Sequence, residues 1–352
     1  MLPEAEHGIL LRVDGCRRRS NERAMIITQA PYRISFAGGG TDLPAFYRGE
    51  PGAVISTAID RHMYVTVGER FDDTIRVAYS KTEIVDTPSE LKHSLVREAL
   101  SLTGLDRSLE ISTIGDVPAG TGMGSSSALT VGLLAALYAY QGRIAGPEEL
   151  ASQACEIEIE RAGSPIGRQD QYISAYGGLQ YLRFNPDQTV DVEPVPCSRR
   201  VLHDLEERLL LFYTGSTRDA NTILKTQSGV TGSKLDVLRR MRDLAGEMRD
   251  TLTGPGGADL EHFAELLHEG WELKRTVVST ISNGMVDEWY RSARQAGARG
   301  GKLLGAGGGG FLLVMAEPER HEAVRDALGR PKELPVAFDP RGARVIFIGN
   351  RA

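Results

Sequence analysis

Three glycine-rich loops, at the beginning, middle and end of the chain, constrain its fold more than any other feature. They occupy residues 38–42, 118–128 and 305–310 in a chain of 352 residues that has 40 glycines. Glycine has no Cβ, so the backbone of such loops can turn tightly or pass close to a ligand. The apolar residues, 41% of the chain, suffice for about two domains with a sizeable core. The sequence therefore predicts a globular protein whose binding chemistry lies in its loops.

Charge and cysteine content exclude several classes of function. The net charge of −6 and the pI of about 5.8 provide no basic field that would attract nucleic acid or an anionic membrane. The three cysteines are far apart and form no C-x-x-C pair, so neither a disulfide framework nor a thiolate zinc site is expected. The longest apolar stretch, residues 129–140, is shorter than the roughly 20 residues that cross a bilayer. We expect a cytoplasmic protein with no nucleic-acid or membrane partner, and a homodimer stays open.

The apolar pattern predicts strands and helices in mixed order, divided into two domains. Residues 1–24 are interpreted as a flexible leader, for which a nucleic-acid arm around Arg17, Arg18 and Arg19 is the alternative. Two prolines and a cysteine between strand-like pieces at residues 190–198 mark the domain boundary. The predicted strands are residues 25–36, 53–67, 109–114, 209–213, 311–315 and 345–348, and the predicted helices are residues 125–140, 148–162, 235–252, 260–278 and 285–296.

The middle loop has the form of an anion site. A glycine-rich turn that opens a helix exposes unpaired amide N–H groups at the positive end of the helix dipole. Residues 120–127 have this form, and Ser125, Ser126 and Ser127 add hydroxyls that can bind phosphate oxygens or a metal. The alternative is a core helix that these serines merely cap. No Gly-Lys-Ser/Thr ends the loop, so a Walker A phosphate loop is excluded.

The third loop, residues 305–310, matches the dinucleotide fingerprint G-x-G-x-x-G. That fingerprint must follow a strand and open a helix. Here we expect a helix before the loop and a strand after it, which argues against a Rossmann oxidoreductase. A tight connection within a sheet is the simpler interpretation.

Together, the three loops resemble the three motifs of the GHMP kinases, a superfamily that includes galactokinase, homoserine kinase and mevalonate kinase. The central signature Pro-x-x-x-Gly-(Leu/Met)-Gly-Ser-Ser-x-Ala matches residues 118–128, and residues 30–42 resemble the first motif, with Arg33 and Asp42 at the galactokinase separation. The resemblance extends over residues 26–350. It implies an α+β, two-domain fold, with a ribosomal protein S5 domain 2-like N-terminal domain in residues 25–195 and a ferredoxin-like C-terminal domain in residues 196–352.

The resemblance also implies an ATP-dependent kinase with Mg²⁺ as cofactor. The catalytic aspartate of galactokinase maps onto Asp170, and Arg33 stabilises charge on the reacting oxygen. The magnesium ligands map onto Ser126 and Glu158, with Glu156 or Glu160 as alternatives to the glutamate. The residues implied to bind ATP are Pro118, Gly120, Gly122, Met123, Gly124, Ser125, Ser126 and Ser127.

The implied substrate is a sugar phosphate. Residues 39 and 40 are glycines where galactokinase has Glu-His, so a roomier sugar pocket is expected. Residues 79–83, 168–172 and 212–218 are most similar to the branch that phosphorylates D-glycero-D-manno-heptose 7-phosphate on its anomeric hydroxyl. An anomeric kinase of an unphosphorylated sugar and a catalytically silent sugar-binding homologue are the alternatives. The residues implied to bind the substrate are Gly39, Gly40, Thr41, Asp42, Arg168, Gly307, Gly308 and Arg218, and the candidates to hold its phosphate are Lys81, Arg168, Arg218 and Lys225.

Overall fold

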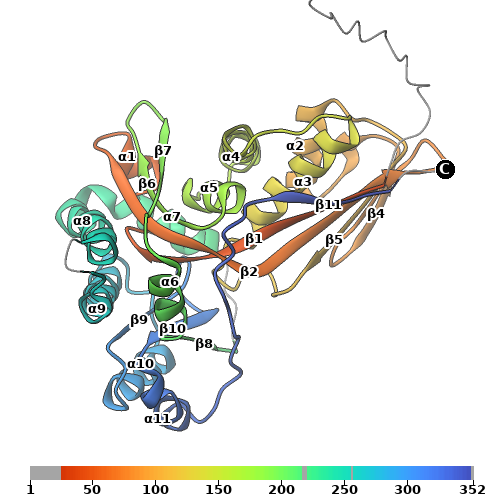
Figure 1. Cartoon of the computed structure of the whole chain (residues 1–352). Helices are drawn as coiled ribbons and strands as arrows, with labels where there is room; N and C mark the ends of the chain where they lie inside the picture. The colour runs from red at the N-terminus through yellow and green to blue at the C-terminus, as the bar shows by residue number, and fades with distance from the viewer. Residues whose placement is uncertain (1–24, 216–219, 255–256, 350–352) are drawn as a thin grey trace, which may run out of the picture.

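The protein folds around two β-sheets (Figure 1). The computed structural model describes residues 25–215, 220–254 and 257–349, so the expected leader and Arg218 lie outside the described residues. In that part of the chain no helix is both long and apolar enough to span a membrane.

The first sheet has eight strands in the order β11-β1-β2-β5-β3-β4, with β6 and β7 continuing from β2. Its long central strands β1 and β2 pair antiparallel, and the register shifts between Pro31 and Arg33 and again between Ser35 and Ala37. Such irregularities re-aim side chains, and Arg33 lies between the two. The strands are β1 (Met25–Ala37), β2 (Gly52–Glu69), β3 (Ile75–Ala78), β4 (Thr82–Val85), β5 (Leu109–Gly115), β6 (Leu179–Phe184), β7 (Val190–Pro194) and β11 (Arg344–Gly349).

Helix α3 (Ser125–Tyr140) packs against β1 and β2 and is buried nearly all round. The close approach depends on Gly132, whose carbonyl accepts a hydrogen bond from Thr28 Oγ1 at 2.7 Å. Four further helices belong to the same unit: α1 (Pro44–Tyr47), α2 (Ser94–Thr103), α4 (Pro147–Cys155) and α5 (Gln169–Tyr176). The short 3₁₀ turn η1 (Pro88–Glu90) and the π-helix η2 (Glu156–Arg161) complete it.

The second sheet is three-stranded, antiparallel and ordered β8-β10-β9. Its strands are β8 (Leu209–Tyr213), β9 (Gly300–Leu303) and β10 (Phe311–Met315). The helices around it are α6 (Arg199–Glu206), α7 (Ala220–Val230), α8 (Leu235–Thr253), α9 (Leu260–Val277), α10 (Gly284–Gln295) and α11 (His321–Ala327), with the 3₁₀ turns η3 (Thr231–Lys234) and η4 (Pro318–Arg320).

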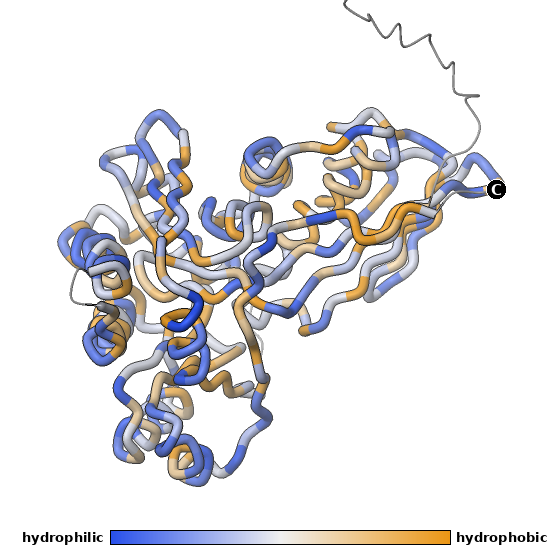
Figure 2. The backbone as a smooth tube through the Cα atoms, in the orientation of Figure 1, coloured by the Kyte–Doolittle hydropathy of each residue, from blue (hydrophilic) through white to orange (hydrophobic). Residues whose placement is uncertain are grey.

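A shared apolar core joins the two units. The cluster includes Tyr32 and Phe36 of β1 with Leu244 of α8, Phe263 of α9 and Leu313 of β10. The rings of Phe36 and Phe263 meet edge to face with centroids 5.2 Å apart. The apolar strand β11 also returns to pair with β1 (Figure 2). The sequence division into residues 25–195 and 196–352 therefore does not separate the sheets, because the last strand of the second stretch belongs to the first sheet.

The predicted α+β class is confirmed, and most long elements match their expected bounds within about two residues. Three expectations were wrong. The serines do not cap α3, because Gly124 occupies the cap position at φ +76° with no side-chain hydrogen bond. The helix expected over residues 148–162 ends at Cys155 and continues as the π-helix η2. The third glycine loop follows a strand, β9, rather than a helix.

Candidate active site

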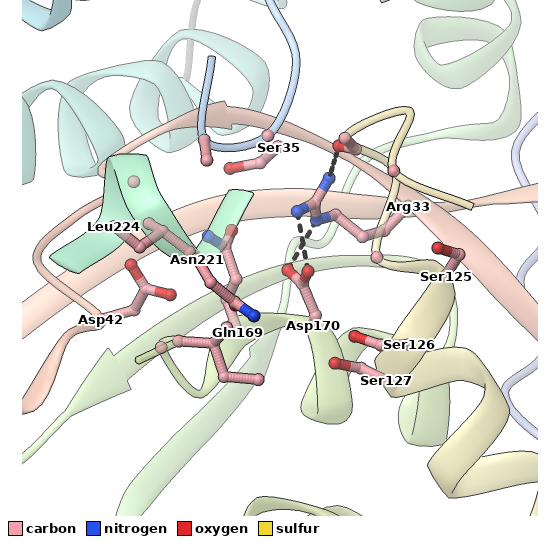
Figure 3. A pocket seen from close by; sticks show the side chains of 18 of the residues that line it. Arg33, Ser35, Asp42, Ser125, Ser126, Ser127, Gln169, Asp170, Asn221 and Leu224 are labelled. Atoms are coloured by element: carbon pink, nitrogen blue, oxygen red, sulfur yellow. Dashed lines mark hydrogen bonds and ion pairs between the residues drawn. The ribbon is translucent and has the colours of Figure 1, made fainter. Parts of the chain in front are cut away.

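The three glycine loops meet at one pocket of about 380 Å³ (Figure 3). Gly39 and Gly40 come from the first loop, Gly120, Gly122 and Gly124 from the second, and Gly305 from the third. Helices α2, α3, α5, α7 and α9 and strands β1, β2 and β9 also contribute to its walls. Both units therefore contribute side chains to one cavity.

An ion pair between Arg33 and Asp170 lies in this pocket (Figure 3). Arg33 Nε and Nη2 donate to the two carboxylate oxygens of Asp170 at 2.7 and 2.8 Å, and Nη1 donates to the carbonyl of Gly122 at 2.6 Å. A bidentate pair fixes both position and orientation. Arg33 is nearly buried whereas Asp170 is 22% exposed on its side chain, so the carboxylate remains open to a ligand.

The N-terminus of α3 opens onto the same pocket. Gly120, Gly122 and Gly124 all have positive φ, which lets the backbone curl in front of the helix. The hydroxyls of Ser126 and Ser127 donate to Glu158 Oε2 at 3.1 and 3.2 Å instead of capping the helix. With no side chain capping the first turn of α3, its amides are available to an anion. This is the arrangement expected of a phosphate site, and not of a merely capped core helix.

Glu158 is a buried carboxylate with no cationic partner among the described residues. Burial raises its pKa to about 7, against the opposing effect of the hydroxyls of Ser127 and Ser126. It lies in the π-helix η2, whose wider turn is a geometry common at functional sites. Glu156, in contrast, pairs with Arg161, and Glu160 is exposed.

A magnesium ion fits this carboxylate, because a buried unpaired acid beside a hydroxyl is stabilised by a cation. Among the described residues no group of three or more His, Cys, Asp or Glu side chains could hold a metal unaided. Magnesium is commonly held by one or two carboxylates together with substrate phosphates. The site therefore suits a metal that arrives with a nucleotide.

The first glycine loop is organised around Asp42. Its Oδ1 accepts the N–H of Gly40 at 2.8 Å, and burial raises its pKa. Thr41 faces inward, donating to the Gly38 carbonyl at 2.8 Å, so its hydroxyl supports the loop. At Gly39 an added Cβ would touch only Gln169 Nε2, at 3.9 Å, whereas at Gly40 it would lie 2.1 Å from Gln227 Nε2. The expected extra room therefore exists at Gly39, and Gln227 of α7 fills it at Gly40.

The second and third loops touch backbone to backbone. A Cβ at Gly122 would lie 2.5 Å from the carbonyl oxygen of Leu304, and a Cβ at Gly310 would lie 2.3 Å from that of Thr121. A Cβ at Gly305 would in turn lie 2.4 Å from the Cα of Gly122. The glycines of the third loop thus serve mainly to let two loops approach each other.

Several predicted residues do not reach the pocket wall. Arg168 donates to the carbonyl of Gln188 at 2.5 Å and lies over the ring of Tyr47. Gly308 donates its N–H to the carbonyl of Ile281 at 2.9 Å, and Gly307 packs against the same residue. The other predicted residues off the wall are Pro118, Met123 and Thr41 of the loops, the exposed lysines Lys81 and Lys225, and Glu158, which contacts the wall residues Ser126 and Ser127.

Among the wall residues that the sequence analysis missed are two lysines, Lys274 of α9 and Lys302 of β9. Each is only 6% exposed. The spacing of Phe263, Leu267, Trp271 and Lys274 puts the lysine on the buried face of α9, a signal that could have identified it. Helix α7 adds Asn221, Leu224 and Gln227, which no motif indicated.

Comparison with known proteins agrees with this geometry. Family models match the GHMP kinases N terminal domain over residues 91–178 and the GHMP kinases C terminal domain over residues 256–333. The D-glycero-alpha-D-manno-heptose 7-phosphate kinase of Campylobacter jejuni is 30% identical over 317 residues, 86% of this chain and 93% of the relative. A mevalonate kinase of Methanothermobacter thermautotrophicus is 32% identical over 303 residues, 82% of this chain and 91% of the relative.

A solved structure of another kinase is similar to this protein over most of its fold. The crystal structure of a D-glycero-D-manno-heptose 1-phosphate kinase from Bacteroides thetaiotaomicron superposes with a TM-score of 0.74 at 27% identity. The match covers 91% of this chain and 98% of that one. The chain belongs to the GHMP kinases, a family of ATP-dependent phosphotransferases.

Proposed function

We propose that this protein is a sugar kinase that transfers the γ-phosphate of MgATP to the anomeric hydroxyl of a sugar phosphate. The observation that carries the proposal is the Arg33–Asp170 ion pair, which lies between the open N-terminus of α3 and the Asp42 loop. An anion site, a positioned carboxylate and a polar sugar loop are the parts that phosphoryl transfer to a hydroxyl requires.

Each of these residues has a defined task. The amides at the start of α3 and the hydroxyl of Ser125 bind the triphosphate, and Ser126 and Glu158 hold Mg²⁺, which neutralises charge on the β- and γ-phosphates. Asp170 removes the proton from the acceptor hydroxyl, because its carboxylate is held in one orientation and is open to the pocket. Arg33 stabilises the charge that develops on the reacting oxygens.

The acceptor is best described as D-glycero-D-manno-heptose 7-phosphate, the substrate in the name of the Campylobacter jejuni relative. The room at Gly39, where an added Cβ would meet no atom closer than 3.9 Å, supports an acceptor longer than galactose, because a larger side chain there would fill that room. Asp42 and the side chains of Gln169 and Gln227 supply hydrogen-bond partners for several hydroxyls.

A panel of acceptors tests this assignment by ADP release. It contains the heptose 7-phosphate, the same heptose without phosphate, fucose, galactose and mevalonate. We expect kcat/KM for the heptose 7-phosphate to exceed that for the unphosphorylated heptose at least about a hundredfold, since a phosphate held by one or two cations supplies roughly 3 kcal/mol. Better turnover of mevalonate or of a neutral sugar would reject the proposed substrate, and no ADP with any acceptor would favour a silent homologue.

A further inference from the structure

Lys274 and Lys302 carry buried amino groups that form no ion pair with a carboxylate of the described residues. Lys302 Nζ donates to the carbonyls of Ser35 and Phe36 at 2.8 and 3.0 Å, and Lys274 Nζ donates to the carbonyl of Gly305. Neither lysine forms an ion pair within the described part of the chain. Because an ammonium group has three N–H donors, Lys302 retains one and Lys274 retains two.

The pocket wall therefore has more basic side chains than carboxylates. Arg33 is already matched by Asp170, which leaves Asp42 as the remaining carboxylate of the wall opposite two lysines. Burial lowers the pKa of Lys274 to about 8 and that of Lys302 well below its usual value, and the raised pKa of Asp42 reduces the compensation further. A buried charge is costly unless it is paired. An anionic ligand would supply the missing partner.

The lysines lie on the acceptor side of the pocket. Together with Phe36 and Gly39 they also line a second, small cavity beside the first glycine loop, which shares Gly39 and both lysines with the main pocket. The charges of Arg33 and Asp42 affect the pKa of both lysines, and the charge of Lys274 also lowers the pKa of Lys302. Gly39 is also the position where an added Cβ would meet no atom closer than 3.9 Å. An acceptor that extends past Gly39 would bring its far end toward these ammonium groups.

We propose that Lys274 and Lys302 bind a phosphate that the sugar already carries before the reaction. The inference rests on the proposed sugar kinase and gives its phosphorylated acceptor a binding site built from α9 and β9. Lys81, Lys225 and Arg168, the described candidates from the sequence, do not line the pocket. The γ-phosphate of ATP has the same chemistry and is the alternative ligand of the two lysines. The experiment therefore distinguishes the phosphate of the sugar from that of ATP.

The test uses Lys274→Gln and Lys302→Gln in the full-length enzyme. Glutamine removes the charge but keeps an N–H that can donate to the same carbonyls. Lys332→Gln is the matched control, because Lys332 is exposed and lies outside the pocket wall. We expect kcat/KM for heptose 7-phosphate to fall at least about tenfold in both pocket variants, while kcat/KM for the unphosphorylated heptose and KM for MgATP change less than about threefold. Equal losses on both acceptors, or a raised KM for MgATP, would assign the lysines to the nucleotide and overturn the inference.

Calorimetric titration of the nucleotide-free protein with inorganic phosphate distinguishes the two proposals. Phosphate binding that weakens at least about tenfold in both pocket variants supports the lysine site even if no sugar is phosphorylated, an outcome that rejects only the sugar kinase. Sugar phosphorylation with phosphate binding unchanged in the variants rejects the lysine site and leaves the kinase.

The wild-type enzyme supplies a readout that does not depend on whether the variants fold. Arg33, Asp42 and Lys302 face Lys274, and its pKa of about 8 means that it loses its proton in the alkaline range. The ratio of KM for heptose 7-phosphate to KM for the unphosphorylated heptose should therefore rise from pH 7 to pH 9. A constant ratio over this interval contradicts the inference.

Discussion

At the scale of residues, the Arg33–Asp170 pair is the centre of the account. Asp170→Asn keeps the size of the side chain but removes both the base and the charge that Arg33 binds. We expect kcat to fall at least about a hundredfold, the usual effect of losing a general base. MgATP should still protect the variant from thermal unfolding, since Ser126 and Glu158 are untouched. Turnover close to wild type would show that the proton is removed elsewhere.

The second prediction concerns Glu158 and the pH dependence of Mg²⁺ binding and of stability. With a folded-state pKa of about 7, raised by burial, the carboxyl must lose a proton before it holds Mg²⁺. Mg²⁺ affinity at saturating ATP should therefore fall about fivefold from pH 7 to pH 6, and Glu158→Gln should remove the part of this dependence that exceeds the titration of ATP itself. The metal-free protein should show the opposite trend in stability, because a raised carboxyl pKa stabilises the fold at low pH and that contribution is lost as pH rises through about 7. A pH-independent difference between wild type and variant would reject Glu158 as ligand.

Residues in motifs were predictable, whereas isolated ones were not. Arg33, Asp42, Ser126, Glu158 and Asp170 lie near one another as the resemblance implied. Lys302 lies in a short strand that has no sequence signal of its own, and a single lysine is usually a solvated surface residue, whereas the apolar spacing of α9 does place Lys274 on the buried face of that helix. What makes them notable is their burial, which depends on how distant segments pack.

At the scale of elements, the contact between the second and third glycine loops makes a further prediction. Gly122→Ala combines a positive φ with a Cβ that would lie 2.5 Å from the Leu304 carbonyl. We expect it to lower the free energy of unfolding by about 2 kcal/mol or more and to raise KM for ATP. Gly142→Ala is the matched control, because φ is +82° but nothing lies within 4 Å. Equal effects of the two substitutions on stability and on KM would show that the loop contact contributes nothing.

Helices and strands in which apolar residues repeat regularly were predictable, and the exceptions have physical causes. Helices α8 and α9 match their expected bounds closely because their apolar faces repeat regularly. Strand β9 contributes four residues, two of them glycine, and carries no strand signal of its own. The π-helix η2 differs from an α-helix by its hydrogen-bond spacing, which side-chain periodicity does not reveal.

At the scale of the whole molecule, the chain after α11 ties the two units together. Asp339 is buried and its Oδ2 lies 2.9 Å from His62 Nε2 of β2 and 3.2 Å from Arg344, while Phe338 bridges to Ile59. Asp339→Ala removes this acceptor from the buried His62 and from Arg344. We therefore expect the free energy of unfolding, measured by chemical denaturation, to fall by about 3 kcal/mol. Asp326→Ala, which breaks an exposed pair with Arg330, should cost less than about 1 kcal/mol. Similar losses of unfolding free energy in the two variants would mean that the contacts of Asp339 do not stabilise the fold.

The division of the chain into two continuous domains was the expectation that sequence could least support. Proline and a change of composition near residue 195 indicate a break in the chain. Pairing of β11 with β1 is a contact between the two ends of the chain, and no local pattern reports it. The pocket depends on the same long-range packing, since its walls come from both units.

The central claim is transfer of phosphate from MgATP to the anomeric oxygen of a sugar phosphate, and ³¹P NMR of the product tests it most directly. The enzyme is incubated with MgATP and D-glycero-D-manno-heptose 7-phosphate, with Asp170→Asn as the control. The account predicts a second sugar phosphorus signal, split into a doublet by the anomeric proton, that grows as ATP is consumed and does so at least about a hundredfold more slowly in the variant. A new phosphate on any other hydroxyl, or consumption of ATP with no second sugar phosphorus signal, would contradict it.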